Sequence, residues 1–262
     1  MSDDFPIRVD QRGRVAIWTL DRPDRLNALS GDALAAIGNL AREAAGNGSL
    51  RAIVLTGAGN KAFCAGADLK ERQAMSDDQI RMRLADYRRE LGALDCCPKP
   101  VIAALNGLTL GGGLELALCC DLRVAVAHAE LGLPETSIGL VPGAGGTQRL
   151  PRIIGEGRAK EMVLLARRVP AEEALAWGLV NRIVPPGRDL IEDVLQWIGP
   201  IADGAPLAQA GALEALSRSF DVSLDVGLEL EKVSYEKALV SADRREAMNA
   251  FAEKRRPRFL GK

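Results

Sequence analysis

Short apolar runs alternate with amphipathic stretches along the first part of the chain. Runs rich in β-branched residues predict buried strands at 15–20, 52–56, 101–104 and 122–126. Between the second and third runs, apolar side chains recur at steps of four, three, four and three, which is the spacing of one helical face. These residues are Ile80, Leu84, Tyr87, Leu91 and Leu94. Strands that alternate with helices predict an α/β fold.

The pattern changes toward the C-terminus. Helical spacing continues from roughly 157 to 166 and again over 172–177, where Gly178 is placed to cap the helix end. The last clear strand pattern is 179–184, and only helical patterns follow the prolines at 185–186. We therefore predict a core domain over 1–195 and a helical C-terminal region over 196–262.

Composition and charge exclude several classes of protein. In 262 residues, 34 Lys and Arg balance 35 Asp and Glu, so the net charge is -1. No nucleic acid and no anionic membrane surface is expected as a partner of so balanced a chain. Asn106, three glycines and Glu115 interrupt the most apolar stretch, 101–127, which predicts a buried core segment rather than a membrane span.

The cysteines and the single histidine limit the chemistry further. The five cysteines form two adjacent pairs and a single, without CxxC spacing, so no disulfide framework is predicted. Together with an acidic start that does not resemble a signal peptide, this predicts a reducing, cytoplasmic location. His128 alone cannot build a multi-histidine metal centre, and Cys64 is interpreted as an apolar filler rather than a nucleophile.

Two glycine-rich loops after predicted strands carry the candidate chemistry. One leads from 57–59 into 63–68, and the other is 111–113, directly before a predicted helix. Glycine lets a ligand approach backbone N–H groups closely, and a helix start adds the positive end of its dipole. Two such donors converging on one point would stabilise an oxyanion such as a thioester enolate.

Two alternatives to this interpretation exist. Both loops could be ordinary turns between strands and helices. The residues 57–59 also resemble the start of a dinucleotide-binding GxGxxG motif, but Ala62 occupies its third glycine position and no helical period follows.

Two glutamates are candidates for acid and base chemistry. Glu115 lies in the first predicted turn of the helix after the second loop, and Glu135 follows it by twenty residues. A pair of carboxylates in an apolar cleft can divide general acid and base work. Alternatively, Glu115 simply interacts favourably with the helix dipole.

Taken together and in order, the motifs of the chain resemble the crotonase (enoyl-CoA hydratase/isomerase) superfamily. The match extends from Arg22-Pro23 and 27–29 near the start to 251–255 near the end. Residues 65–72 and 114–118 are most similar to the methylglutaconyl-CoA hydratases. The central motifs are 63–71, 104–107, 111–117, 120–123 and 142–151.

The resemblance implies a spiral of ββα turns and a C-terminal helical region that assembles trimers, often as hexamers. It implies an oxyanion hole from the N–H groups of Ala67 and Gly112. It also implies that Glu115 and Glu135 add water reversibly across the α,β double bond of a trans-2-enoyl-CoA. On this basis Glu115 deprotonates water and Glu135 exchanges the α-proton. A Δ3-Δ2 enoyl-CoA isomerase, which needs one carboxylate, and a homologue without turnover remain the alternatives.

Substrate contacts follow from the same resemblance. Coenzyme A, as part of the acyl-CoA substrate, is expected near Arg25, Ala65, Asp68 and Leu69, with Lys254 reaching its phosphates. No metal and no redox cofactor is implied. Some methylglutaconyl-CoA hydratases bind RNA through a lysine-rich helix, but the corresponding stretch here has a single basic residue, Arg42. We therefore expect no RNA binding.

Overall fold

A six-stranded sheet forms the centre of the molecule, which we describe from a computed structural model over residues 6–262. The acidic start that bears on the signal-peptide prediction lies outside these residues. Strands β1 and β2 are antiparallel, and each later neighbour is parallel to the strand before it. In sheet order the strands are β1 (Ile7–Arg12), β2 (Val15–Leu20), β3 (Ala52–Gly57), β5 (Val101–Leu105), β7 (Leu122–Val126) and β10 (Arg182–Val184).

A second sheet of four short strands lies beside the first. Successive turns of the chain place one strand in the large sheet, the next in the small sheet, and then a helix: β3–β4–α2, β5–β6–α4, β7–β8–η2. This arrangement confirms the predicted spiral of ββα turns. The small sheet is β4 (Ala62–Cys64), β6 (Leu108–Leu110), β8 (Glu130–Gly132) and β9 (Arg168–Pro170).

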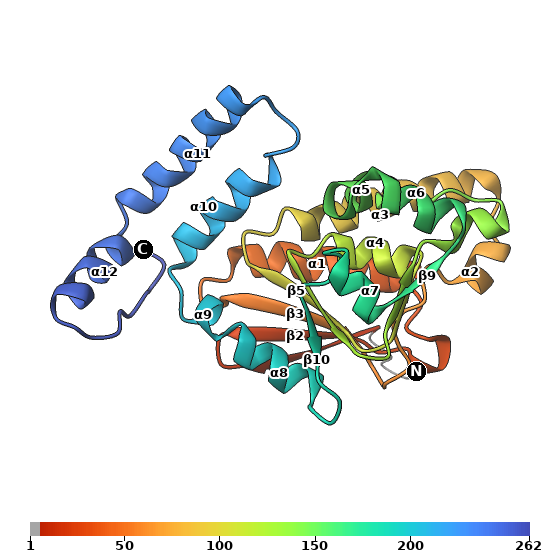
Figure 1. Cartoon of the computed structure of the whole chain (residues 1–262), viewed down its shortest axis with the longest axis horizontal. Helices are drawn as coiled ribbons and strands as arrows, with labels where there is room; N and C mark the ends of the chain where they lie inside the picture. Colours follow the sequence, from red (N-terminus) through yellow and green to blue (C-terminus); the bar gives the residue numbers. More distant parts are fainter. Residues whose placement is uncertain (1–5) are drawn as a thin grey trace.

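Helices cover both faces of the large sheet (Figure 1). Helices α1 and α3 pack against each other on one side, and α8 packs on the other. No helix among residues 6–262 is long and apolar enough to cross a membrane. The helices are η1 (Pro23–Arg25), α1 (Gly31–Gly46), α2 (Leu69–Gln73), α3 (Asp77–Asp95), α4 (Gly112–Leu118), η2 (Pro134–Ile138), α5 (Gly146–Ile154), α6 (Glu156–Leu164), α7 (Ala171–Ala176), α8 (Leu190–Trp197), α9 (Gly199–Ala202), α10 (Pro206–Ser217), α11 (Leu224–Leu239) and α12 (Ala242–Ala252).

The core follows from the period of two along the central strands. In β2, Val15 and Ile17 face one apolar cluster, while Ala16 and Trp18 face the other. All six residues of β2 and of β3 are buried, as expected for strands covered on both sides. Their near-continuous apolar runs made these strands easy to predict.

The predicted central strands and helices are confirmed, and so is Gly178 at the end of α7, with φ +78°. The pattern did not reveal the small sheet, whose strands have only three residues each. Such strands are too short to show a period. It also missed β1, in which only Ile7 is buried.

The C-terminal helices α10, α11 and α12 extend away from the body of the molecule (Figure 1). The predicted division near residue 195 falls within α8, whose Val194 packs on the large sheet. The exact division therefore stays a prediction. Several large apolar side chains of the C-terminal region are exposed: Leu216, Phe220, Leu224, Val226, Leu228, Val233, Tyr235 and Phe251.

Asn106, directly after β5, fixes the turn between β3 and β4. Its Nδ2 donates to the carbonyls of Gly57 and Gly59, both at 2.8 Å, and its Oδ1 accepts from the Gly57 N–H at 3.1 Å. Leaving such buried backbone groups unpaired would cost about 1–3 kcal/mol each. The side chain therefore holds the segment that leads into Cys64 and the first glycine loop.

Candidate active site

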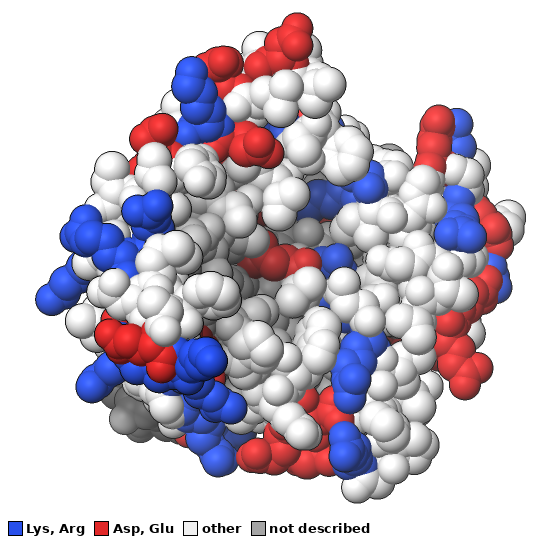
Figure 2. Space-filling view, turned by 60° about the vertical axis from the view of Figure 1, so that its left-hand side comes forward, with Lys and Arg blue, Asp and Glu red and all other residues white. Residues whose placement is uncertain are grey.

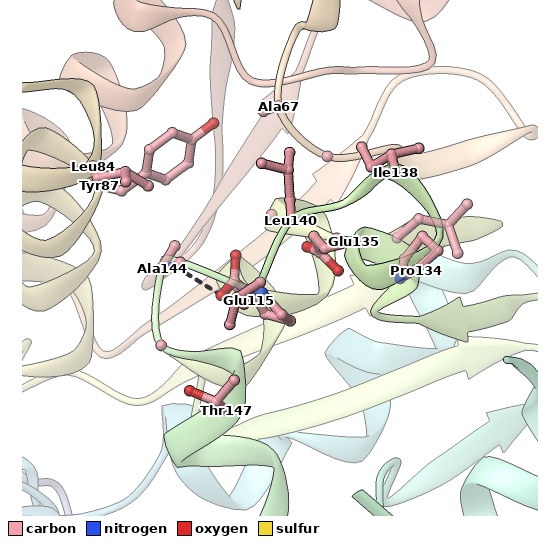
Figure 3. A pocket seen from close by; sticks show the side chains of 18 of the residues that line it. Ala67, Leu84, Tyr87, Glu115, Pro134, Glu135, Ile138, Leu140, Ala144 and Thr147 are labelled. Atoms are coloured by element: carbon pink, nitrogen blue, oxygen red, sulfur yellow. Dashed lines mark hydrogen bonds between the residues drawn. The ribbon is translucent and has the colours of Figure 1, made fainter. Parts of the chain in front are cut away.

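A cavity of about 870 Å³ opens where the first glycine loop meets the start of α4. One wall is α3, another is the segment from η2 to the start of α5, and the floor is formed by α4. Figure 3 shows Ala67, Tyr87, Glu115 and Glu135 around the same space. The cavity thus gathers residues from four separate parts of the sequence.

Two backbone segments that line the cavity, one around Gly66 and the other at the start of α4, approach each other very closely. A Cβ on Gly113 would lie 2.1 Å from the Cys64 carbonyl oxygen, and one on Gly66 would lie 3.0 Å from that of Leu110. Gly66 and Gly111 also have φ values of +104° and +52°, which L-residues rarely adopt. Glycine is therefore required at these positions for steric reasons.

This approach brings the N–H groups of Ala67 and Gly112 together. A Cβ on Gly112 would lie 3.5 Å from the Ala67 nitrogen. Leu29 hydrogen-bonds to the Gly66 carbonyl and the Asp68 N–H on either side, so the Ala67 N–H points away from Leu29. The Gly112 N–H belongs to the unpaired first turn of α4. Neither group has an acceptor among residues 6–262.

Glu115 is held rigidly on the cavity floor. It lies in the first turn of α4 with 3% of its surface exposed. Its Oε1 accepts hydrogen bonds from the N–H groups of Ala144 at 2.7 Å and Gly146 at 2.8 Å. Burial raises the pKa of Glu115, and these two bonds, with the positive charge of Arg149, oppose the rise. The carboxyl group is thus fixed at one oxygen while the other remains available.

Glu135 lies on η2 and faces the same cavity. Burial, assisted by the negative charge of Glu115, raises its pKa from 4.5 to about 7, against the opposing charge of Arg72. Its Oε2 is buried and has no hydrogen-bond partner in the described part of the chain. Near neutral pH this carboxyl group can therefore either give or accept a proton.

The structure brings some of the other predicted site residues to the cavity and not others. Ala65 and Leu69 line it. The Asp68 carboxylate caps α2 and pairs with Arg22 at 2.9 Å, so its acceptors are already occupied. Arg25, on η1 beside Asp24, is not a lining residue.

Lys254 lies far from the cavity within a single chain. It follows α12, with φ +55°, at the far end of the C-terminal helices (Figure 1). Its predicted contact with coenzyme A therefore requires a neighbouring subunit.

The two side chains considered as nucleophile or metal ligand, Cys64 and His128, do not line the cavity. Burial raises the pKa of the Cys64 thiol to about 12, so it stays neutral. His128 is exposed and contacts the Asn60 carbonyl at 3.1 Å. No cluster of three or more metal-binding side chains occurs within residues 6–262.

Sequence reasoning missed the residues that hold Glu115. Ala144 and Gly146 act through backbone N–H groups, so their side chains carry no chemical signal. The glycines at 143, 145 and 146 were the available clue, because a glycine cluster outside a tight hairpin indicates close approach by another group.

The fold and the cavity define a class of protein: a ββα spiral whose cavity brings two backbone N–H groups, unpaired within residues 6–262, together with two carboxyl groups. Residues 10–262 match the family model described as enoyl-CoA hydratase/isomerase. The chain belongs to this family.

Individual relatives agree with this assignment. The short-chain-enoyl-CoA hydratase of Clostridium acetobutylicum is 38% identical over 95% of this chain and 95% of its own length. The enoyl-CoA isomerase/hydratase fer4 of Mycosarcoma maydis is 41% identical over 93% of this chain and 91% of its own length. The crystal structure of an enoyl-CoA hydratase from Bacillus anthracis is 44% identical, with a TM-score of 0.95 over 98% of this chain and 100% of that one.

The raised pKa of Glu135 predicts a pH-dependent cost to stability. Between pH 4.5 and 7 the unfolded state loses this proton while the folded state keeps it, so folding becomes less favourable as pH rises. Glu135→Gln, which is neutral at every pH, should therefore be more stable than the parent at pH 8 but not at pH 4.

Thermal unfolding at both pH values tests this expectation. Glu172→Gln, an exposed carboxylate on α7, serves as the matched control and should show no such difference. Equal stability of Glu135→Gln and parent at pH 8 would show that this carboxyl group has an ordinary pKa.

Proposed function

We propose that the protein is an enoyl-CoA hydratase that adds water reversibly across the α,β double bond of a trans-2-enoyl-CoA thioester. One observation carries the proposal: Glu115 and Glu135 line the same cavity as the unpaired N–H groups of Ala67 and Gly112. The names of its relatives support the same reaction.

The N–H groups of Ala67 and Gly112 would bind the thioester carbonyl oxygen. When water adds to the β-carbon, negative charge develops on this oxygen as the enolate forms. Two fixed donors, one of them at the positive end of α4, stabilise that charge more than the neutral substrate. Loss of one such donor typically costs about 10² to 10³ in rate.

The two carboxyl groups divide the proton transfers. Glu115, held at Oε1, uses its other oxygen to orient water and takes one of its protons as the remaining hydroxide bonds to the β-carbon. Glu135 gives its proton to the α-carbon, and the enolate electrons form the new C–H bond. Glu115 then holds one proton and Glu135 none. The pair as a whole therefore carries a single proton before and after the reaction.

A Δ3-Δ2 enoyl-CoA isomerase is the second candidate, and the name of the Mycosarcoma maydis relative favours it. Isomerisation moves a proton between the α- and γ-carbons of the acyl group. One carboxyl group suffices for this, so water activation at Glu115 would be unnecessary. The requirement for both glutamates separates the two reactions.

The acyl group could also carry a charge. Arg72 and Arg88 line the cavity, and neither forms an ion pair within residues 6–262. Methylglutaconyl-CoA, with a carboxylate at the acyl end, would use such a cation, whereas crotonyl-CoA would not. Relative kcat/KM values for these two substrates decide between them.

Both glutamates should be essential for hydration. We expect Glu115→Gln and Glu135→Gln each to lower kcat for crotonyl-CoA by at least about 10²-fold, the low end for a positioned acid or base. Loss of the conjugated thioester absorbance measures the rate. If one variant retains near-normal turnover, that residue does not take part, and retention of isomerase activity in Glu115→Gln would favour the isomerase.

The rate should depend on pH as a bell-shaped curve. Hydration needs exactly one proton on the carboxyl pair, so kcat/KM should fall above about pH 7, where Glu135 ionises. It should fall again at acidic pH, where Glu115 becomes protonated. Dehydration needs the same total number of protons and should give the same profile. A flat profile between pH 6 and 9 would contradict this assignment.

The exposed apolar side chains of the C-terminal helices support an oligomer. Amphipathic helices need a partner to bury their apolar faces, and Phe220 and Phe251 are 76% and 84% exposed in one chain. We propose a trimer or a hexamer built mainly by this region. It would carry Lys254 to a neighbouring cavity, where it would contact the phosphates of coenzyme A. The unpaired cysteines support a reducing, cytoplasmic location.

Lys254→Ala should raise KM for crotonyl-CoA much more than it lowers kcat, because a remote phosphate contact binds substrate and transition state about equally. Added salt should reduce the difference between variant and parent. Light scattering at micromolar concentration reports the assembly in parallel. A monomeric mass, or an unchanged KM in Lys254→Ala at low salt, would contradict the proposed contact.

A further inference from the structure

The segment that holds Glu115 is intrinsically difficult to order. Three of its four residues, at 143, 145 and 146, are glycines, which lose more conformational freedom on folding than any other residue. Nevertheless the N–H groups of Ala144 and Gly146 must both point at one oxygen of Glu115. Some other contact has to restrict this segment.

Arg149 provides that contact from the first turns of α5. A Cβ on Gly145 would lie only 2.0 Å from Arg149 Nη1, so the guanidinium occupies the space over Gly145. The same nitrogen lies 3.5 Å from the Ala144 carbonyl oxygen. The guanidinium therefore covers the residue between the two donors to Glu115.

Asp95 holds the guanidinium in this position. It is the last residue of α3, and its Oδ2 accepts a hydrogen bond from Arg149 Nη2 at 2.8 Å. Helix α3 also supplies Leu84 and Tyr87 to the cavity wall. The ion pair thus connects the helix on one side of the cavity with the segment that holds Glu115.

We propose that the Asp95–Arg149 ion pair positions Glu115 for water activation by clamping residues 144–146. The proposal rests on the proposed hydratase function, in which Glu115 is the base. Neither Asp95 nor Arg149 reacts with the substrate; both act through the backbone N–H groups that fix Glu115.

The pair also separates two cavities. Gly145, Gln148 and Arg149 line both the active-site cavity and a cleft of about 840 Å³ between the core and α10. Figure 2 shows that the face presented by the C-terminal helices is hollowed and that acidic and basic side chains lie inside the hollow. The side chain of Arg149 therefore lies between the two cavities.

The pKa of Glu115 can distinguish two effects of removing Asp95: the loss of its negative charge and the loss of the clamp. Arg149 on α5 interacts electrostatically with Glu115. The other titratable groups that do so are Tyr87 on α3, Cys119 after α4 and Glu135 on η2. Asp95→Asn removes a negative charge, which by itself would lower the pKa of Glu115. Loss of the clamp would weaken the two N–H bonds and raise this pKa. The two explanations predict opposite shifts.

The experiment measures the hydration of crotonyl-CoA by the full-length protein over pH 4–9. In Asp95→Asn we expect kcat to fall about 10-fold or more, while KM changes less than about two-fold, as for a transition-state effect. The acidic limb of the profile should move up by about one pH unit, the size of one lost charge-assisted hydrogen bond.

Further variants control for charge and folding. Arg149→Gln should behave like Asp95→Asn, and Arg149→Lys, which can still pair with Asp95, should recover part of kcat. Arg152→Gln is the matched control, because Arg152 is on the same helix and pairs with Asp221 at 3.2 Å. Arg152→Gln should leave the acidic and the basic limb of the pH–rate profile unchanged. Circular dichroism checks that each variant folds. Asp95 is exposed, so its substitution should disturb the fold least of these variants.

An unchanged kcat and acidic limb in Asp95→Asn would overturn the proposal, as would a downward shift of the limb with kcat retained. Glu115→Gln, measured alongside, reports on the hydratase function alone. Full activity in Glu115→Gln would refute the function itself, whereas its loss together with a normal Asp95→Asn would refute only the clamp.

Discussion

The close approach of two backbones, one around Gly66 and the other at the start of α4, is the constraint on which the rest of the site depends. No side chain larger than hydrogen fits where Gly113 meets the Cys64 carbonyl. Because the backbones are so close, the N–H groups of Ala67 and Gly112 can reach one ligand atom. The same helix carries Glu115, three residues after Gly112, into the same cavity. The two N–H groups and the Glu115 carboxyl group therefore owe their common location to the same backbone approach.

The surrounding fold maintains this approach from both sides. Strands β4 and β6 of the small sheet run parallel, and the segment around Gly66 and helix α4 follow directly from their carboxyl ends, as expected for ligand sites in parallel α/β sheets. Asn106 fixes the turn between β3 and β4, and the Asp95–Arg149 pair adjoins the segment that holds the Glu115 carboxylate. Both contacts lie outside the two glutamates but adjoin the backbone segments that shape the cavity.

Much of this could be predicted from the sequence, and the limits have physical causes. The long buried strands appear as continuous apolar runs, and α3 shows clear helical spacing of its apolar residues. The glycine loops and both glutamates are residue types whose chemistry indicates a site. The order of motifs then indicated the family. The three-residue strands of the small sheet have no detectable period, and the donors at Ala144 and Gly146 act through backbone atoms that every residue has. The distance of Lys254 from the cavity follows from the path of the C-terminal helices, which no local sequence pattern shows.

The two N–H groups of Ala67 and Gly112 belong to the backbone, and a site built on backbone groups has an evolutionary consequence. A substitution that leaves the path of the backbone unchanged leaves these two donors in place, so a site that can bind a negatively charged oxygen is inherited with the fold itself. The carboxyl groups, by contrast, are ordinary side chains that single codon changes can replace. Descendants of such a protein can therefore change the reaction that they catalyse while they keep the two backbone donors.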